Sequence, residues 1–152
     1  MMHPTIDIKT FLKPGVRAHL AGIGGGSMCP LAGGLLGMGL RVQGSDMTES
    51  GTVRQLRTQG IDVAIGHSAE NLKDCDLVIR TAAIHDENPE IAGAIARGIP
   101  VYERAQAWGA IMQHYENALC ISGTHGKTTT TSMATHIFMA AQADPTVMIG
   151  GT

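Results

Sequence analysis

The sequence predicts an α/β fold in which a parallel sheet carries helices on both of its faces. Apolar runs of strand length alternate with amphipathic segments of helix length, which is the pattern of a parallel sheet. Glycine is abundant, with 20 residues in a chain of 152, and glycine suits the tight turns between strands and helices. The length allows one domain and part of a second.

The first domain begins with an apolar run at 16–23, which reads as a strand buried on both faces of the sheet. A glycine-rich turn follows, and residues 30–38 then place Leu31, Leu35 and Met38 on one helical face. Further strands are expected at 40–45, 61–65, 77–80 and 99–102. Further helices are expected at 51–59, 88–97 and 105–114, the second of them starting at Asn88 and a proline. This order favours right-handed crossovers between parallel strands.

The pattern restarts near residue 117, with a strand at 118–122, a loop, a helix at 128–141 and a strand at 146–149. We therefore expect a leader at 1–15 with a short helix at 7–12, a Rossmann-like domain at 16–116, and the truncated start of a phosphate-loop domain at 117–152. This last part is too small to bury a core of its own, which favours a fragment. Its helix, with Met133 and Ile137 on one side, should be exposed, fold onto the first domain or pair between copies.

The composition excludes several classes of function. A formal net charge of -2 provides no basic field for a polynucleotide or an anionic membrane. The odd number and wide spacing of Cys29, Cys75 and Cys120 argue against a disulfide framework or a metal site, so we expect reduced, buried thiols. The sequence has no run of 18 apolar residues and no signal-peptide pattern at its start, so we expect a cytoplasmic chain.

The turn Gly22-Ile-Gly-Gly-Gly-Ser-Met28 joins a predicted strand to a predicted helix. Backbone N–H groups at such a helix start bind phosphate. Gly22 and Gly24 match the dinucleotide-binding fingerprint, although Ser27 stands where that pattern has a third glycine. Asp46 ends the next strand, where a carboxylate can reach a ribose hydroxyl. The alternative is that the glycines only form a tight turn and that Asp46 caps the following helix.

The segment Gly123-Thr-His-Gly-Lys-Thr128 also lies between a predicted strand and a predicted helix. It is a short form of the phosphate loop, in which Lys127 would neutralise the terminal phosphates of a nucleotide. The hydroxyl of Thr128, or of Thr129, would coordinate Mg²⁺. Threonine is a poor helix former, so the run of threonines suits caps and ligands better than helix interior. A chance lysine in a glycine-rich loop is the alternative.

Together with Gly44-Ser-Asp46, Arg80-Thr-Ala-Ala-Ile84, Asn88-Pro-Glu90 and Gly98-Ile-Pro100, these two motifs resemble, in order, the Mur ligases of peptidoglycan and cell-wall synthesis. The resemblance runs from about residue 16 to the last residue. It implies that the first domain binds UDP-N-acetylmuramate and that the complete enzyme uses Mg²⁺ and ATP to join L-alanine to it through an acyl phosphate, while this chain alone is inactive. His125 and the threonine run favour the L-alanine branch. A branch that attaches a tripeptide to the same sugar nucleotide also carries this histidine.

The resemblance also implies the site residues. Catalysis would depend on Lys127 and Thr128. The ATP site would consist of Gly123, Thr124, His125, Gly126, Lys127, Thr128 and Thr129, with Thr128 and Thr129 at the metal. The UDP-sugar site would consist of Gly22, Gly24, Gly25, Gly26, Ser27, Met28, Ser45, Asp46, Thr81, Ala82, Ala83 and Arg104, with His67 as a further candidate.

Two other classes of function stay open from the sequence. An NAD-dependent oxidoreductase would explain the glycine turn and Asp46, but it leaves Lys127 unexplained. A non-catalytic sugar-nucleotide-binding or regulatory module would retain both loops. The histidines at 3, 19, 85, 114 and 136 show no ligand spacing, and no chemistry is assigned to them. Ser27 and Ser122 have no evident histidine and carboxylate relay for nucleophilic catalysis.

Overall fold

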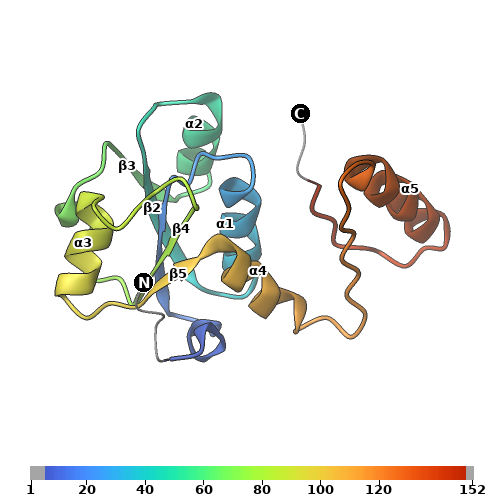
Figure 1. Ribbon diagram of the computed structural model, residues 1–152, viewed down its shortest axis with the longest axis horizontal. Coiled ribbons are helices and arrows are strands. Elements are labelled where there is room, and N and C mark those ends of the chain that lie inside the picture. The colour runs from blue at the N-terminus through green and yellow to red at the C-terminus, as the bar shows by residue number, and fades with distance from the viewer. Residues whose placement is uncertain (1–5, 150–152) are drawn as a thin grey trace. The chain divides into compact units, whose positions relative to one another are not determined.

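A computed structural model describes residues 6–149, and the chain divides into two compact units, Met1–His114 and Tyr115–Thr152. The first unit contains a five-stranded sheet in the order β3-β2-β1-β4-β5 (Figure 1). The strands are β1 (Arg17–Ala21), β2 (Arg41–Asp46), β3 (Asp62–Ile65), β4 (Leu77–Arg80) and β5 (Val101–Glu103). All neighbouring strands are parallel, which confirms the predicted fold class. The strand order reverses between β1 and β4, and ligands of such sheets bind at this reversal.

Helices cover both faces of the sheet, as predicted. The helices α1 (Met28–Gly37), α2 (Gly51–Thr58) and α4 (Arg104–Met112) lie on one face, and α3 (Pro89–Ala96) lies on the other (Figure 1). Two 3-10 helices complete the unit, η1 (Ile8–Phe11) beside α4 and η2 (Ala69–Leu72) beside α3. Residues 1–5 of the expected leader, His3 among them, lie outside the described residues.

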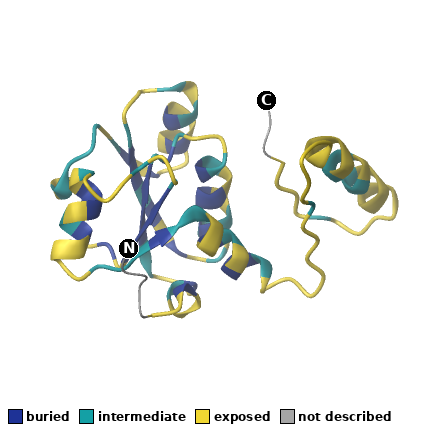
Figure 2. Ribbon diagram, viewed as in Figure 1, coloured by how far each residue is buried: buried dark blue, intermediate teal, exposed yellow. Residues whose placement is uncertain are grey.

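The two faces of the sheet bury separate apolar clusters. Leu20 and Ile79 belong to the larger cluster, which includes side chains of α1, α2 and α4. Their neighbours Ala21 and Val78 belong to the smaller cluster against α3 and η2. Successive side chains of a strand point to opposite faces, so the central strands are buried on both sides (Figure 2). This burial fixes the positions of the strand ends, where the loops of the candidate site begin.

The second unit contains the helix α5 (Lys127–Ala140), which buries none of its residues. The strands predicted at 118–122 and 146–149 are not formed, so these predictions were wrong. A strand is stable only when its N–H and C=O groups pair with a neighbouring strand, and the only sheet within residues 6–149 is that of the first unit. The exposed face predicted for the helix is present, with Met133 and Ile137 both more than half exposed.

Two smaller expectations also need correction. No side chain caps α5: its N-cap is Gly126 in the left-handed conformation, and the Thr131 hydroxyl donates to the Lys127 carbonyl at 2.8 Å instead. Cys75 is buried, and burial raises the pKa of its thiol to about 11, but Cys120 is exposed. No helix in residues 6–149 is long and apolar enough to cross a membrane.

Candidate functional site

The residues expected at the UDP-sugar site gather at the carboxyl edge of the sheet. The turn at 22–28 follows β1, and Asp46 ends β2. Thr81 follows β4, and Arg104 follows β5. His67 lies just after β3. Gly66, between β3 and His67, donates its backbone N–H to the Asp46 carbonyl at 2.8 Å. The topology thus brings together five segments that lie far apart in the sequence.

The glycine turn is held by its own backbone hydrogen bonds. The amides of Gly22 and Ile23 donate to the Ser45 carbonyl at 2.8 and 3.0 Å, so the turn is tied to the end of β2. Gly22 has a φ of +77°, which glycine adopts without strain. The Gly25 amide donates to the Gly22 carbonyl at 3.1 Å and closes the turn. These three amides are therefore not available to a ligand, and neither is the Gly24 amide, which has a partner of its own.

That partner is Asp46, whose carboxylate approaches the turn closely. Its Oδ2 accepts from the Gly24 amide at 2.9 Å, and its Oδ1 accepts from the Thr48 amide at 3.1 Å. A Cβ on Gly24 would lie 2.8 Å from Oδ2, so glycine is required here by the carboxylate. The alternative that Asp46 caps the next helix is wrong, because α2 is capped by Ser50, whose hydroxyl accepts from the Val53 amide at 3.2 Å.

Two amides of the turn remain open. Those of Gly26 and Ser27 have no hydrogen-bond partner among the residues that the structure describes. A Cβ on Gly26 would meet no atom within 4 Å, so this part of the turn faces open space. The Arg104 guanidinium donates to the Ser27 hydroxyl from the first residue of α4. Unpaired N–H groups beside a guanidinium form a good binding site for a diphosphate.

Two residues predicted at the UDP-sugar site face inward. Met28 is fully buried, and its amide donates to the Gly25 carbonyl at 2.9 Å. Ser45 is also fully buried, and its hydroxyl donates to Glu90. Their side chains therefore shape the site from behind, and the ligand-facing part of the turn is smaller than the sequence motif.

The loop after β4 packs beside the glycine turn. A Cβ on Gly22 would lie 3.3 Å from Ile84 Cδ1 and 3.7 Å from Thr81 Cγ2. The Ile84 amide donates to the Thr81 carbonyl at 3.1 Å, which forms a turn that exposes Ala82 and Ala83. Thr81, Ala82 and Ala83 thus lie at the same edge as the turn, as predicted, and their contact with a ligand stays a prediction.

Arg80 holds this loop to the start of α4. Its Nη1 donates to Asp86 Oδ1 at 2.5 Å, and its Nε donates to Glu103 Oε1 at 2.9 Å. Burial alone would lower the pKa of Arg80, but the two carboxylates outweigh it and raise the pKa. Because Arg104 directly follows Glu103, Arg80 also helps to position Arg104. The sequence motif contained Arg80, but no role was predicted for it.

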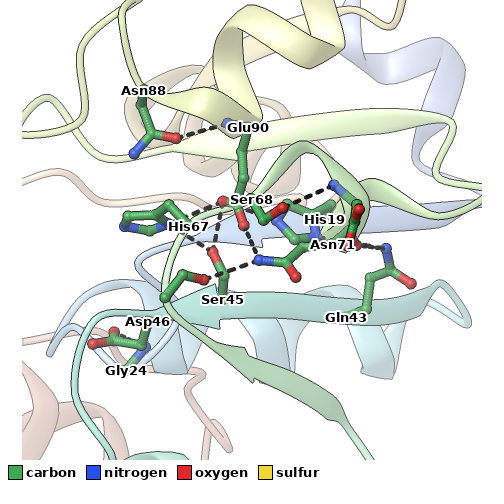
Figure 3. Close-up of polar contacts among 12 residues, drawn as sticks. His19, Gly24, Gln43, Ser45, Asp46, His67, Ser68, Asn71, Asn88 and Glu90 are labelled. Carbon is green, nitrogen blue, oxygen red and sulfur yellow. Dashed lines mark hydrogen bonds and ion pairs between the residues drawn. The ribbon is translucent and has the colours of Figure 1, made fainter.

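A buried carboxylate, Glu90 in the first turn of α3, lies behind the site (Figure 3). Ser45 Oγ donates to its Oε2 at 2.6 Å, and Asn71 Nδ2 donates to its Oε1 at 2.6 Å. His67 Nδ1 lies 3.1 Å from Oε2. His19 Nε2 lies 3.2 Å from Oε2 on the other side, outside the direction of a hydrogen bond, so this contact is electrostatic.

Burial alone would raise the pKa of Glu90. The electrostatic contact with His19 and the hydrogen bonds from Ser45 and Asn71 outweigh burial and lower the pKa to about 2. Glu90 is therefore ionised at neutral pH although it has no exposed surface. Glu90 was predicted only as part of a helix start, and no chemistry was predicted for His19, because the local sequence shows neither the burial of these residues nor their partners.

The second unit contains the loop before α5. Lys127 Nζ donates to the carbonyls of Gly123 and Thr124 at 2.6 and 3.4 Å, so the ammonium group closes over its own loop. The first-turn amides of Lys127, Thr128 and Thr129 have no partner in the described ranges. Gly126, with a φ of +77°, turns the backbone into the helix. The open amides and the nearby ammonium fit a bound phosphate.

A hollow of about 500 Å³ lies elsewhere in the first unit, between η1 and α4. Tyr102 lines it, and the Tyr102 hydroxyl donates to the Ile6 carbonyl at 2.8 Å. None of the residues expected at the UDP-sugar site lines this hollow. The carboxyl edge, where the predicted residues converge, is therefore the candidate site.

A family model described as "Mur ligase family, catalytic domain" matches residues 17–116. The chain is 50% identical over 135 residues to the UDP-N-acetylmuramate–L-alanine ligase of Clostridium novyi, covering 89% of this chain and 30% of that protein. It is 49% identical over 142 residues to the ligase of the same name from Agathobacter rectalis, covering 93% of this chain and 31% of that protein. The chain thus spans about a third of the length of these curated relatives.

Solved structures show the same similarity. The UDP-N-acetylmuramate-alanine ligase of Thermotoga maritima matches with a TM-score of 0.81 at 37% identity, covering 89% of this chain and 32% of that one. The UDP-N-acetylmuramate:L-alanyl-gamma-D-glutamyl-meso-diaminopimelate ligase from Neisseria meningitides matches with a TM-score of 0.82 at 30% identity, covering 91% of this chain and 44% of that one.

Proposed function

Because the chain belongs to the Mur ligase family, we propose that its first unit binds UDP-N-acetylmuramate at the carboxyl edge of the sheet. The names of the similar ligases support this substrate. The observation that carries the proposal is the pair of unpaired amides at Gly26 and Ser27 beside the Arg104 guanidinium. This arrangement suits the diphosphate, and Asp46 and His67 lie where the nucleoside would follow.

For the complete ligase, we propose the joining of L-alanine to UDP-N-acetylmuramate. The chain is 50% identical to an L-alanine ligase but 30% identical to the tripeptide ligase of known structure, over similar shares of the chain. The L-alanine reaction is therefore favoured over the addition of a tripeptide. The cytoplasmic location and self-association through α5 stay predictions.

In this proposal, ATP with Mg²⁺ supplies the phosphoryl group that activates the muramoyl carboxylate for attack by the amine. The loop at 123–129 would hold the ATP phosphates through the open first-turn amides, and Lys127 would neutralise their charge. The hydroxyls of Thr128 and Thr129 would hold the metal. Gly123, Thr124, His125 and Gly126 would shape the loop around the phosphates.

Binding of UDP, UDP-N-acetylmuramate and NAD to the chain tests the substrate proposal. We expect both uridine ligands to raise the free energy of unfolding, by about 2.7 kcal/mol at a hundredfold excess over Kd, and NAD to have no effect. Stabilisation by NAD alone would instead support the oxidoreductase alternative.

Variants of the turn test the place of binding. A Cβ at Gly26 enters the open space where the diphosphate must approach, so Gly26→Ala should weaken UDP binding about tenfold at unchanged stability. Arg104→Ala should weaken it by at least as much, because it removes a charged donor. The control is Gly33→Ala, whose Cβ also meets nothing within 4 Å but lies within α1. Binding of UDP at wild-type affinity by both Gly26→Ala and Arg104→Ala would refute the proposed place of binding.

A further inference from the structure

The network around Glu90 determines the protonation of a histidine at the site. Ser45 Oγ donates its only proton to Glu90 Oε2 at 2.6 Å, because an ionised carboxylate can only accept. The serine oxygen can therefore only accept from His67 Nδ1, which lies 3.0 Å away. Glu90 Oε2, 3.1 Å from the same nitrogen, is also an acceptor. His67 Nδ1 thus faces two acceptors and must carry a proton.

The other ring nitrogen of His67 is then left for a ligand. In the neutral ring, a proton on Nδ1 leaves Nε2 as an acceptor. Nε2 has no hydrogen-bond partner among residues 6–149, and it is not among the buried unpaired atoms, so it reaches solvent. Figure 3 shows the ring pointing away from Glu90. The backbone before His67 is joined to Asp46 through the Gly66 amide, so this acceptor lies at the carboxyl edge.

Other contacts of Glu90 fix where the ring lies. Asn71 Nδ2 bridges Glu90 Oε1 at 2.6 Å and the Gly66 carbonyl at 2.9 Å, so Glu90 also holds the turn that carries His67. On the far side, Gln43 Nε2 lies 3.5 Å from His19 Nδ1, and it donates to the carbonyls of Asn71 and Leu72.

We propose that Glu90 is a positioning residue, which acts through Ser45 and His67 to present His67 Nε2 as an acceptor for a hydrogen-bond donor of the bound nucleoside. The inference rests on the proposed binding of a uridine nucleotide at this edge. The donor is either a ribose hydroxyl or the ring N–H of uracil. Glu90 has no exposed surface and does not touch the ligand. Two histidines and a carboxylate suggest a metal site, but no such group in the described chain is arranged to hold an ion.

The tautomer of His67 can be measured in the free wild-type chain. Long-range proton–nitrogen NMR correlations at pH 8 should show the proton on Nδ1 and none on Nε2. A proton on Nε2 would overturn the inference without the need for a variant. This measurement does not depend on ligand binding, so it also distinguishes the two proposals: a chain that fails to bind UDP but has the Nδ1 proton contradicts only the proposed function.

A double-mutant cycle tests the action of Glu90 through His67. Glu90→Gln should shift the His67 tautomer and weaken UDP binding about tenfold, and it should have no further effect on Kd in a His67→Ala background. An equal loss of affinity in both backgrounds would show a purely structural role and overturn the inference. Ser45→Ala, which removes one of the two acceptors of His67 Nδ1, should shift the tautomer in the same direction and serves if Glu90→Gln does not fold.

Ligand analogues identify the donor, and a charge control completes the test. Loss of the Glu90→Gln effect with 2′-deoxy-UDP would assign the contact to the ribose hydroxyl, and its loss with N3-methyl-UDP would assign it to the ring N–H. Retention of the full effect with both analogues would overturn the inference. The control Glu87→Gln removes the same charge from an exposed position three residues earlier and should leave tautomer and Kd unchanged.

Discussion

The buried charge of Glu90 should make the first unit sensitive to acid. The pKa of this carboxyl falls from an ordinary 4.5 to about 2, because its hydrogen bonds outweigh the cost of burial. The native state therefore binds fewer protons than the unfolded state between these values. The stabilisation is fully present above about pH 4.5 and is lost as the pH falls towards 2.

The size of the effect follows from the shift. At about 1.36 kcal/mol per pH unit, the difference corresponds to about 3 kcal/mol in the free energy of unfolding. About 2 kcal/mol of this should already be lost at pH 3, where the native carboxyl is still mostly ionised but the unfolded one is not. A loss of this size is a substantial part of the stability of a small domain.

Urea unfolding of the wild type and of Glu90→Gln between pH 5 and pH 3 measures this contribution. Trp108, the single tryptophan of the chain, lies in α4 and packs against the larger core cluster, so its fluorescence reports on the first unit. We expect the unfolding free energy of the wild type, minus that of Glu90→Gln, to fall by about 2 kcal/mol from pH 5 to pH 3. Groups that titrate in both proteins cancel in this difference. A difference that stays constant would refute the account of Glu90. Glu87→Gln, which is exposed, should follow the wild type.

Backbone and capping variants give further expected outcomes. Gly44→Ala would place a Cβ 2.5 Å from the Leu20 carbonyl oxygen on β1, so it should lower the unfolding free energy by about 3 kcal/mol or fail to fold. Gly33→Ala, with no atom near its Cβ, should stabilise α1 by up to about 1 kcal/mol. Equal urea midpoints for Gly33→Ala and Gly44→Ala would contradict the close approach of β1 and β2 at Gly44. Ser50→Ala removes the hydroxyl that accepts from the Val53 amide at the start of α2, so it should cost about 1 kcal/mol in the same assay. A midpoint unchanged from wild type would show that this cap contributes nothing.

The sheet of the first unit could be predicted because its central strands are apolar runs, as expected of strands buried on both faces. β4 (Leu77–Arg80) has the predicted bounds, since four apolar or long side chains between turn signals leave little choice for a strand buried on both faces. α1 begins at Met28, two residues before the predicted start, because proline fits the first turn of a helix and did not have to be its first residue. Errors of this size are usual at helix ends.

The second unit could not be predicted from the same pattern. Residues 118–122 and 146–149 are apolar enough for strands, but strand formation also needs a neighbour to pair with, and local sequence does not report whether one is present.

The role of Glu90 was missed for a related reason. An acidic residue in the first turn of a helix is explained by the helix dipole alone, so nothing in the local pattern places Glu90 beneath the site. His67 could be identified as a candidate, but its orientation depends on three residues from β2, η2 and α3.

In the proposed function, the site binds a dianionic diphosphate although two carboxylates, Asp46 and Glu90, lie at the same edge of the sheet. Like charges would weaken binding if these groups faced the ligand. Instead, Asp46 accepts from the amides of Gly24 and Thr48, and Glu90 accepts from Ser45 and Asn71. Each carboxylate is therefore matched by protein donors, and each one orders a segment that faces outward. Asp46 fixes the glycine turn, so that its remaining amides stay open beside Arg104, and Glu90 fixes the ring of His67. The negative charges of the site thus arrange its open amides and the His67 ring, and the groups left for the phosphates are neutral or positive.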